Sequence, residues 1–441
     1  MKKHTQLIEK TLKAMGFDAL KPMQQATIEA YGKPNDIILL SPTGSGKTLA
    51  FLLPMVANLK PEVTGVQTLI LAPSRELAIQ IDRVFRSMQT GFKITCCYGG
   101  HDIRAEKKSL SEAPAVIVGT PGRILDHLEH DNFDPKAIRT LILDEFDKAL
   151  ELGFTEEMSA IIAKLGPLEK RVLTSATDGT EIPDYTGLKN PETLSFLEDS
   201  NVVTGLTLKQ VKSPVPDKLD TLYRLICELG AGSKLVFCNY RESAERVSHY
   251  LTKEGIANAH FHGGMEQVDR ENALIKFRNG STNVFVSTDL AARGLDIPEI
   301  KHIIHYHLPV NEEAFVHRNG RTARMNAEGN AYLILSPNEY LPEYLKQDPI
   351  HQSLSEVTPS PAKPDWVTLY IGKGKKDKLS KMDIVGFLIQ KGELQKNEIG
   401  MIDVREYHAY VAVKSDKVHE LLKKIHGLKI KNMKTKFAVS H

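Results

Sequence analysis

The sequence is poor in the features that would place a chain outside the ordinary globular proteins. Its 441 residues include four cysteines and one tryptophan, and the formal net charge is only +2. The cysteines, Cys96, Cys97, Cys227 and Cys238, have neither the density of a disulfide-stapled domain nor the spacing of a zinc site. Cys96 and Cys97 lie in an apolar, strand-like run, as small buried residues do. We therefore expect a reduced, cytoplasmic protein.

Long apolar runs are also missing. No stretch reaches the roughly 18–20 residues of a membrane span, and the lysines at the start are not followed by the apolar segment of a secretory signal. No repeat with a period of about 20–50 residues is visible, which excludes a solenoid. Hydrophobic residues make up 41% and charged residues 25% of the chain, as in globular proteins. A chain of this length should form two or three domains.

From residue 37 to about residue 350, short apolar runs alternate with amphipathic helical patterns. The strand-like runs are IILL, TLILA, AVIVG, TLILD, VLTS, KLVFCN, NVFVST, HIIHY and AYLIL. Such alternation predicts α/β units with parallel sheets, and the length exceeds one such sheet. We place one break at residues 203–216, before a helical pattern that starts at Lys218. A second break is the proline-bearing SEVTPSPAKPDW, which is typical of a semi-rigid linker.

These breaks predict two RecA-like parallel-sheet domains followed by a small α+β domain. The predicted boundaries are residues 1–205, 206–355 and 366–441, with a linker at 356–365.

The segment IILLSPTGSGKTLAFLL predicts a phosphate-binding loop between a strand and a helix. Gly44 and Gly46 allow backbone N–H groups to turn toward phosphate oxygens at a helix N-terminus. Lys47 can reach the β- and γ-phosphates, and Thr48 can offer its hydroxyl to Mg²⁺. Ser41 stands where this loop usually begins with glycine. A chance glycine turn is the alternative, but the strand before and the helix after the loop favour a nucleotide site.

The run LILDEFDK places three acids directly after a strand-like segment. Ligands of parallel α/β sheets bind at the carboxyl ends of the strands, so Asp144 and Glu145 should lie beside the phosphates. Asp144 suits a magnesium site, and Glu145 suits the group that positions the attacking water. ATP and Mg²⁺ are therefore the expected ligands. Phe146 should pack on apolar neighbours such as Leu150.

The order of these and other motifs resembles that of the DEAD-box family of RNA-dependent ATPases, from about residue 16 to residue 324. DEFD, residues 144–147, occupies the position of the tetrapeptide that gives the family its name. The other matching segments are GFDALKPMQQ, PSRELA, GG, TPGR, SAT, VFCNY, QVDR, STDLAARGLD and HRNGRTAR. Two departures are Leu7 in place of an upstream aromatic residue, and Ala323 in place of a glycine common in the last motif.

The resemblance implies the following roles. Nucleotide binding is implied for Phe17, Gln24, Ser41, Pro42, Thr43, Gly44, Ser45, Gly46, Lys47, Thr48, Gly294 and Asp296. Coupling of hydrolysis to strand separation is implied for Asp147, Ser175, Thr177 and His317. Contact with the RNA backbone is implied for Pro73, Arg75, Gly99, Gly100, Thr120, Pro121, Gly122, Arg123, Arg270, Thr288, Asp289 and Arg293.

Phosphoryl transfer also needs positive charge on the γ-phosphate, often from an arginine finger. The first domain shows no obvious finger beside its phosphate loop. Arg321 and Arg324, three residues apart in HRNGRTAR, would project from the second domain. With Lys47, Asp144 and Glu145 they complete the catalytic set, so hydrolysis should require the two domains to close.

The C-terminal segment is basic. Residues 366–441 contain 16 Lys and Arg and 8 Asp and Glu, a net +8, whereas the remainder carries a net −6. An anionic polymer is the expected partner of such a tail. The segment reads as strand, helix, strand, strand, helix, strand, which suits an RRM-like sheet. Tyr370 and Tyr410 are either base-stacking residues or ordinary strand residues.

The motifs GKKDKL, DIVGFL, IGMIDV and YVAV resemble the C-terminal domain of DbpA-type DEAD-box proteins. This resemblance implies binding to a hairpin near the peptidyl-transferase centre of 23S ribosomal RNA and a role in large-subunit assembly. The lysines expected to bind RNA are Lys373, Lys375, Lys376, Lys378 and Lys381.

Taken together, the sequence predicts a monomeric ATP-dependent RNA helicase that separates short duplexes. Three alternatives remain open at this point. They are an ATP-gated RNA clamp or remodeller with little unwinding, an RNA-binding assembly factor with a vestigial nucleotide site, and a DNA helicase.

Overall fold

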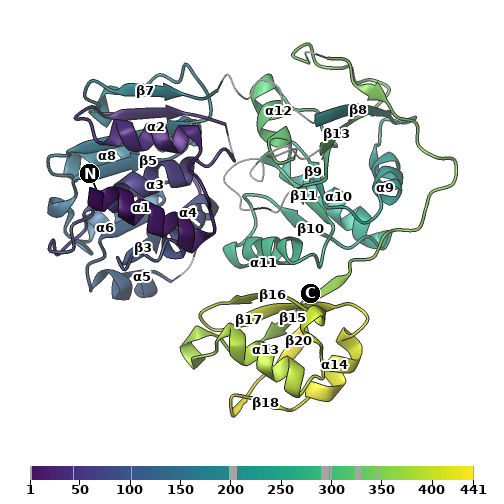
Figure 1. Ribbon diagram of the computed structural model, residues 1–441. Helices are drawn as coiled ribbons and strands as arrows, with labels where there is room; N and C mark the ends of the chain where they lie inside the picture. Colours follow the sequence, from purple (N-terminus) through teal and green to yellow (C-terminus); the bar gives the residue numbers. More distant parts are fainter. Residues whose placement is uncertain are drawn as a thin grey trace. The chain divides into compact units, whose positions relative to one another are not determined.

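The computed structural model describes residues 2–42, 44–100, 102–197, 206–289, 297, 300–322, 329–345 and 347–440 (Figure 1). The chain forms two compact units. The first contains the elements from α1 (Lys2–Met15) to β7 (Glu192–Ser195), and the second those from β8 (Leu206–Lys212) to β20 (Phe437–Val439). In the described part of the chain, no helix combines the length and the apolar character needed to cross a membrane.

The first unit is an α/β layer structure around a parallel sheet. Its other strands are β1 (Ile37–Leu40), β2 (Thr68–Leu71), β3 (Ile94–Cys97), β4 (Val116–Gly119), β5 (Thr140–Leu143) and β6 (Lys170–Ser175). Its other helices are α2 (Pro22–Tyr31), α3 (Lys47–Asn58), α4 (Arg75–Ser87), α5 (Ile103–Leu110), α6 (Pro121–Glu129), α7 (Phe146–Glu151) and α8 (Thr155–Lys164). Within the described residues the sheet has seven strands in the order β3-β4-β2-β5-β6-β1-β7, all parallel.

Alternation along the strands sends side chains to both faces of this sheet. Ile70 belongs to the cluster beneath α1 to α4, whereas Leu69 and Leu71 of the same strand belong to the cluster beneath α6 to α8. Both faces are therefore buried, which explains why these strands read as continuous apolar runs. Local signals start the helices: Ser74 accepts a hydrogen bond from the Leu77 N–H at the start of α4, and Pro121 opens α6.

The second unit repeats this architecture. Its further strands are β9 (Lys234–Phe237), β10 (Asn258–Phe261), β11 (Val284–Ser287), β12 (His302–His305), β13 (Gly329–Leu335) and β14 (Ile350–His351). Its helices are α9 (Leu219–Glu228), α10 (Arg241–Lys253), α11 (Gln267–Arg278) and α12 (Glu312–Asn319). The sheet formed by the described residues is again parallel, in the order β10-β11-β9-β12-β13-β8-β14.

The strand order of the two sheets is the same when each is numbered from its own first strand. This agreement confirms the predicted pair of parallel-sheet domains. One strand was missed by the prediction: the segment at residues 203–216, where a break was placed, contains β8, which pairs with β13 from Leu206 to Lys212. Leu208 and Val211 bury their side chains in this strand, a signal that the nearby turn residues obscured.

The C-terminal part of the second unit is an antiparallel α+β fold. It consists of β15 (Trp366–Ile371), α13 (Lys381–Gln390), β16 (Ile399–Val404), β17 (Ala409–Lys414), α14 (Val418–Ile425), a short hairpin of β18 (Lys429–Ile430) and β19 (Met433–Lys434), and β20. The described residues form a four-stranded sheet in the order β16-β17-β15-β20. The predicted order of elements is confirmed, with the β18–β19 hairpin as an addition.

Candidate functional site

The loops of the first unit divide its sheet edge into two halves. The phosphate loop follows β1, the three acids follow β5, and SAT begins at the end of β6. These strands are consecutive in the sheet, so their carboxyl ends bring the three segments together. PSRELA, GG and TPGR follow β2, β3 and β4, which form the other half of the same edge.

The phosphate loop has the backbone shape that its glycines permit. Gly44 and Gly46 adopt φ values of 79° and 107°, which side-chain-bearing residues rarely take. A Cβ on Gly46 would lie 3.0 Å from Nε2 of Gln24. Gln24 is buried, and its Oε1 accepts a hydrogen bond from the Lys21 backbone N–H at 3.0 Å. The predicted nucleotide-sensing glutamine therefore lies against the loop.

Lysines hold this loop in place. Lys47, at the start of α3, is buried and donates from Nζ to the Ser41 carbonyl at 2.6 Å. Lys21 donates to the Ser45 carbonyl at 2.8 Å, and the Ser41 hydroxyl donates to that of Ser45 at 2.8 Å. Lys21 was missed by the sequence prediction, although it stands three residues before Gln24. Phe17 is half exposed, and Thr43 lies outside the described residues.

The acids that follow β5 are buried and organised by Thr174. The Thr174 hydroxyl donates to Oδ1 of Asp144 at 2.5 Å and accepts from the Glu145 N–H at 3.1 Å. Burial raises the pKa of Asp144 above its ordinary value, against the opposing effects of this hydrogen bond and of the Lys47 ammonium. Glu145 takes φ 48° and ψ 53°, a left-handed conformation that is uncommon outside glycine and typical of functional sites.

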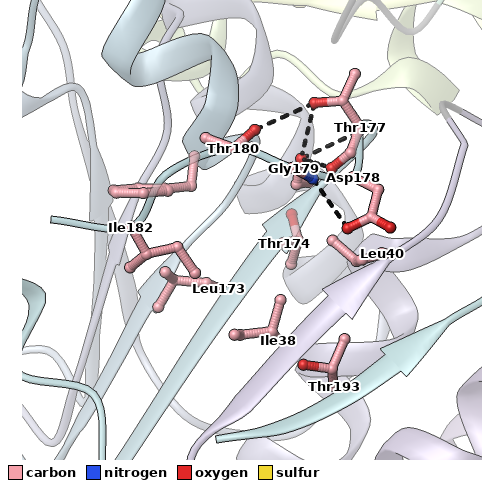
Figure 2. A pocket seen from close by; sticks show the side chains of 12 residues that line it. Ile38, Leu40, Leu173, Thr174, Thr177, Asp178, Gly179, Thr180, Ile182 and Thr193 are labelled. Atoms are coloured by element: carbon pink, nitrogen blue, oxygen red, sulfur yellow. Dashed lines mark hydrogen bonds between the residues drawn. The ribbon is translucent and has the colours of Figure 1, made fainter.

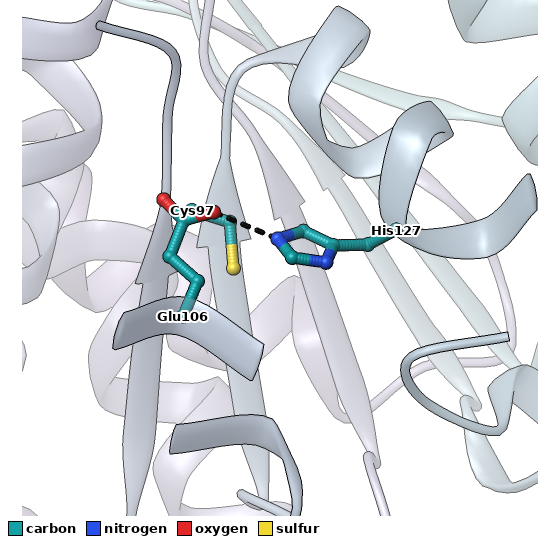
Figure 3. Close-up of side chains that lie close together, drawn as sticks. All are labelled: Cys97, Glu106 and His127. Carbon is teal, nitrogen blue, oxygen red and sulfur yellow. Dashed lines mark hydrogen bonds and ion pairs between the residues drawn. The ribbon is translucent and has the colours of Figure 1, made fainter. Parts of the chain in front are cut away.

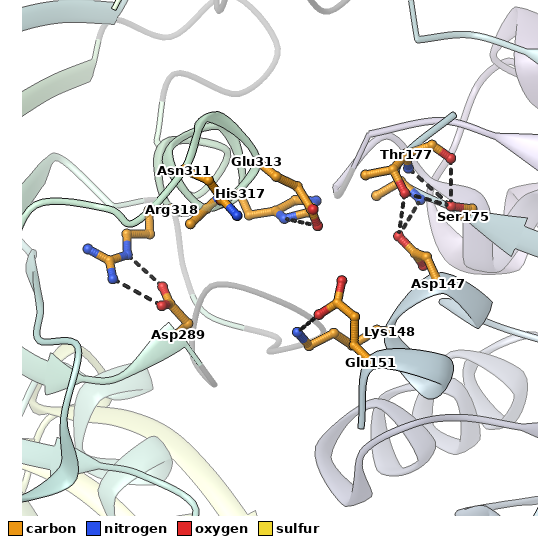
Figure 4. A network of polar contacts seen from close by, with 12 residues as sticks. Asp147, Lys148, Glu151, Ser175, Thr177, Asp289, Asn311, Glu313, His317 and Arg318 are labelled. Carbon is orange, nitrogen blue, oxygen red and sulfur yellow. Dashed lines mark hydrogen bonds and ion pairs between the residues drawn. The ribbon is translucent and has the colours of Figure 1, made fainter. Parts of the chain in front are cut away.

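The third acid, Asp147, contacts SAT, so three of the residues predicted to couple hydrolysis to strand separation lie together (Figure 4). Asp147 accepts a hydrogen bond from the Thr177 hydroxyl at 3.1 Å and a longer one from the Ala176 N–H at 3.4 Å. The Ser175 hydroxyl donates to the Thr177 carbonyl at 2.8 Å. Asp147 therefore contacts both a side chain and a backbone N–H of the SAT segment.

Phe146 packs in the core, as the sequence predicted. It is 2% exposed and belongs to the apolar cluster on which Leu150 also packs. Phe146 lines a cavity of about 220 Å³ whose apolar wall includes Leu173 and Ile182 and whose polar rim includes Thr177 (Figure 2). Its side chain therefore has a packing role, and the acids on either side keep their own partners.

The other half of the sheet edge holds the segments predicted to bind RNA. Arg75 lies against Gly99, where a Cβ would be 3.3 Å from Nη2 of the arginine. Gly100 takes φ 91°. Thr120 and Pro121 begin α6, and Pro73 is buried just before α4.

Arg123 is held by two carboxylates, since Nη1 donates to Glu106 at 2.9 Å and Nε lies 3.9 Å from Asp126. Gly122 has open space where a Cβ would be.

In the second unit, Arg318 organises the motif HRNGRTAR (Figure 4). It is fully buried and forms a two-pronged ion pair with Asp289, with contacts of 2.5 and 3.0 Å. It also donates to the Asn239 side chain at 2.7 Å and lies over the Phe237 ring. Asp289, predicted to contact RNA, is therefore bound by an arginine that the sequence prediction missed. The sequence signal that could have identified Arg318 is its position in the arginine-rich motif HRNGRTAR.

The remaining predicted residues of the second parallel-sheet domain are buried, are partly buried, or lie outside the described residues. Arg321 and His317 are buried, and His317 approaches Glu313 of its own helix at 3.5 Å. Arg270 is buried in α11 and donates to Gln267 at 2.6 Å. Thr288 follows β11 and is partly buried. The predictions for Arg293, Gly294, Asp296 and Arg324 fall outside the described residues.

The predicted lysine loop of the C-terminal fold is ordered by backbone contacts. The Lys375 and Lys376 N–H groups donate to the carbonyls of Arg405 and Glu406 at 2.8 and 2.9 Å. Lys376 lies 4.2 Å from the centre of the Tyr407 ring. Lys375, Lys376, Lys378 and Lys381 are exposed, whereas Lys373 is half buried and pairs with Asp377 at 3.0 Å.

The open face of the four-stranded sheet contacts α11 and the turn after it. The Tyr410 hydroxyl donates to Asn272 at 2.7 Å, and Arg405 pairs with Glu271 at 3.0 Å. Asn279 donates to the Thr368 hydroxyl at 2.8 Å. Tyr410 is thus buried by protein, and the alternative that it is an ordinary packed strand residue is favoured over base stacking.

Three family descriptions match successive parts of the chain. DEAD/DEAH box helicase matches residues 21–184, Helicase conserved C-terminal domain matches residues 217–326, and DbpA RNA binding domain matches residues 368–439. The curated ATP-dependent RNA helicase DbpA of Escherichia coli is 32% identical over 431 residues, covering 95% of this chain and 94% of the relative. ATP-dependent RNA helicase CshA of Listeria monocytogenes is 35% identical and covers 75% of this chain and 65% of the relative.

Solved structures give the same assignment for the two parallel-sheet domains. S. cerevisiae Dbp5 bound to RNA and ADP BeF3 has a TM-score of 0.67 at 28% identity, covering 75% of this chain and 88% of that one. Mss116p bound to ssRNA and AMP-PNP has a TM-score of 0.66 at 25% identity, covering 75% and 72%.

Proposed function

The chain belongs to the DEAD-box family of ATP-dependent RNA helicases, and from this premise we propose that it opens short duplexes of 23S ribosomal RNA during assembly of the large ribosomal subunit in the cytoplasm. The family makes it an ATPase with a DbpA-type RNA-binding domain. The choice of 23S RNA rests on the similarity to the DbpA helicase along nearly the whole chain.

The observation that carries the proposal is the division of one sheet edge. Segments suited to phosphate binding follow β1, β5 and β6, and segments suited to an RNA backbone follow β2, β3 and β4. The contacts of Asp147 with Ala176 and Thr177 lie in the phosphate half. The two halves belong to the same sheet. In this proposal, nucleotide-driven changes at the acids alter the RNA-facing loops through that shared sheet.

The residues of the phosphate half fit ATP and Mg²⁺. The left-handed glycines allow the backbone N–H groups of the loop to turn toward a phosphate. Lys47 would bind the phosphates, and Thr48 and Asp144 would hold Mg²⁺, which neutralises charge on the phosphates when bound. Glu145 accepts the proton of the attacking water. Thr174 fixes both acids, because its hydroxyl bonds the Asp144 carboxylate and the Glu145 backbone.

Arg321 supplies the positive charge for the transferred phosphate in this proposal, with Arg324 beside it in the motif and His317 as a coupling residue. Arg318 is excluded from that role because Asp289 and Asn239 already occupy its guanidinium. The RNA-facing residues contact mainly sugar and phosphate, which carry little sequence information.

Selection of the RNA falls to the C-terminal fold and its net charge of +8 over residues 366–441. Since the sheet face contacts α11 through Tyr410 and Arg405, the exposed lysine loop is the proposed RNA contact. Lys375, Lys376 and Lys378 stand together on it.

The test compares two RNAs with the full-length chain. The half-saturating RNA concentration for ATP turnover should be at least about ten-fold lower for a 23S hairpin from the peptidyl-transferase region than for a random hairpin of equal length. Replacing Lys375, Lys376 and Lys378 by alanine should weaken binding and flatten its salt dependence, by roughly 0.7–0.9 in slope for each lost phosphate contact. Equal half-saturation on both RNAs would contradict the ribosomal assignment. Turnover without strand separation would instead favour an ATP-gated clamp.

A further inference from the structure

Glu106 is a buried carboxylate to which the proposed mechanism gives no part. It lies in α5, is 3% exposed, and gathers three donors, one from the residue after β3 and two from α6. The Tyr98 N–H donates to Oε1 at 2.9 Å, and Arg123 Nη1 and His127 Nε2 approach Oε2 at 2.9 and 2.7 Å. Figure 3 shows the carboxylate of Glu106 facing the His127 ring beside Cys97.

The partners of Glu106 belong to the surface proposed to bind RNA. Tyr98 immediately precedes Gly99 and Gly100, and Arg123 is the last residue of TPGR. Both segments follow neighbouring strands, β3 and β4. One carboxylate thus ties the two loops to each other.

His127 completes the network from one turn further along α6. Asn132 Nδ2 lies 3.1 Å from His127 Nδ1, which suits the tautomer with its proton on Nε2 pointing at Glu106. The histidine itself is fully buried. Arg123 carries five N–H donors, of which Nη1 serves Glu106 and Nε lies 3.9 Å from Asp126, so the guanidinium keeps further donors for a phosphate.

A metal site is the competing reading, because ligand atoms of Cys97, Glu106 and His127 lie within 4.8 Å of one another. The donor chemistry does not fit. Oε2 of Glu106 already accepts from Arg123 and His127. Burial raises the pKa of the Cys97 thiol well above its ordinary value, whereas a metal ligand must be a thiolate. A cationic guanidinium beside the cluster further opposes a metal ion.

We propose that Glu106 is a positioning residue for RNA: it holds Arg123 in the orientation that meets an RNA phosphate and ties that loop to the Tyr98–Gly100 backbone. The proposal rests on the proposed RNA-binding role of this surface. A buried carboxylate is stable only when its oxygens are fully bonded, so the network has one arrangement and Arg123 has little freedom to leave it.

The test variant is Glu106→Gln in the full-length chain. Glutamine preserves the size of the side chain and can still accept from the Tyr98 N–H. Its amide N–H₂ replaces Oε2, the acceptor of Arg123 and His127, so only that link is broken.

Asp36→Asn is the matched control. Asp36 is equally buried, accepts from the Arg171 and Lys189 N–H groups at 2.7 Å, and lies 3.7 Å from an arginine, but it precedes β1 at the opposite end of the sheet.

We expect Glu106→Gln to raise the half-saturating RNA concentration for ATP turnover by roughly ten-fold, as for loss of one aligned charge-assisted phosphate contact. The rate at saturating RNA should change much less. Asp36→Asn should leave the half-saturating RNA concentration unchanged. Glu106→Asp, which keeps the charge, should recover part of the loss. A half-saturating concentration within two-fold of the parent for Glu106→Gln overturns the proposal, as does loss of folding in both Glu106 variants.

The double variant Glu106→Gln with Arg123→Ala separates this proposal from the proposed function. If Glu106 acts through Arg123, the glutamine should add little to the effect of Arg123→Ala. An additional effect of full size overturns the link to Arg123. If Arg123→Ala alone leaves RNA half-saturation unchanged, the RNA role of Arg123 is wrong and this proposal falls with it, while a preference for the 23S hairpin would still be measurable.

Discussion

At the residue scale, the proposed nucleotide site is built from buried polar groups. Asp144 is almost inaccessible to water, so its charge is sustained by the Thr174 hydroxyl and the nearby Lys47 ammonium. Glu145 stands next to it, at the end of β5, in a left-handed backbone conformation. Such a conformation is retained only when the surrounding contacts hold it.

Glu145→Gln should bind ATP but hydrolyse it at least a hundred-fold more slowly, because an amide cannot accept the proton of the attacking water. The bound RNA should then dissociate more slowly with ATP than it does from the parent. Steady-state turnover and RNA dissociation measured on the same preparation check both effects. Near-parental turnover would remove Glu145 from the mechanism.

Phe146→Ala should separate packing from chemistry at the neighbouring position. Loss of the ring enlarges the existing cavity of about 220 Å³, and Phe→Ala changes in cores cost about 3–5 kcal/mol. RNA-stimulated turnover at a permissive temperature should nevertheless stay within a few-fold of the parent, because the acids keep their own partners. Thermal unfolding and turnover are measured in parallel. A hundred-fold loss of activity in folded protein would mean that the ring acts in catalysis.

At the scale of secondary-structure elements, the connection from β4 to α6 depends on close packing. Gly119 ends β4, and a Cβ there would lie 2.4 Å from the Cys97 carbonyl and 2.7 Å from Ile124. The carbonyl belongs to the neighbouring strand and cannot move aside without breaking the sheet. Glycine at this position lets TPGR begin directly beside the GG segment.

Gly119→Ala should therefore destabilise the first unit by about 1–3 kcal/mol or more, the usual cost of overpacking. Gly122→Ala is the comparison, because its Cβ meets nothing within 4 Å and exposed changes of this kind usually stay within about 0.5 kcal/mol. The measurement is the urea-unfolding midpoint of each variant, compared with that of the parent. Equal stability of the two variants would show that the sheet yields at Gly119.

At the scale of the whole molecule, two sheets of one strand order carry different chemistry. The first unit holds the phosphate loop and the acids, and the second holds the arginine motif. Hydrolysis in this proposal needs groups from both.

Arg321→Ala should lower kcat by two or more decades, on the arginine-finger scale of roughly 10³–10⁵. The isolated first domain, residues 1–205, should keep its nucleotide affinity, because that domain lacks Arg321. Arg318→Ala should instead destabilise the second unit, because Asp289 and Asn239 lose their shared partner. Hydrolysis by residues 1–205 at the full RNA-stimulated rate would contradict the two-unit mechanism.

The local chemistry of this protein is readable from its sequence. The phosphate loop, the three acids and SAT are contiguous segments whose residue types are set by backbone shape and ligand chemistry. The buried parallel strands are recognisable because both faces are apolar. The prediction that Phe146 packs beside Leu150 also used only neighbours one helical turn apart. By contrast, β8 was missed because turn residues lie near it and only two of its seven residues are buried, so it does not form a continuous apolar run.

What the tertiary structure decided is which segments become neighbours. The order β3-β4-β2-β5-β6-β1-β7 puts the phosphate and RNA segments on separate halves of one edge, and no local pattern specifies that order. Glu106 meets Arg123 across 17 residues, Arg318 meets Asp289 across 29, and Tyr410 meets Asn272 across 138. Such contacts depend on how helices pack across a sheet and how one fold packs on another. The sequence by itself therefore determined the reactive groups, and the packing of the folded chain determined their partners.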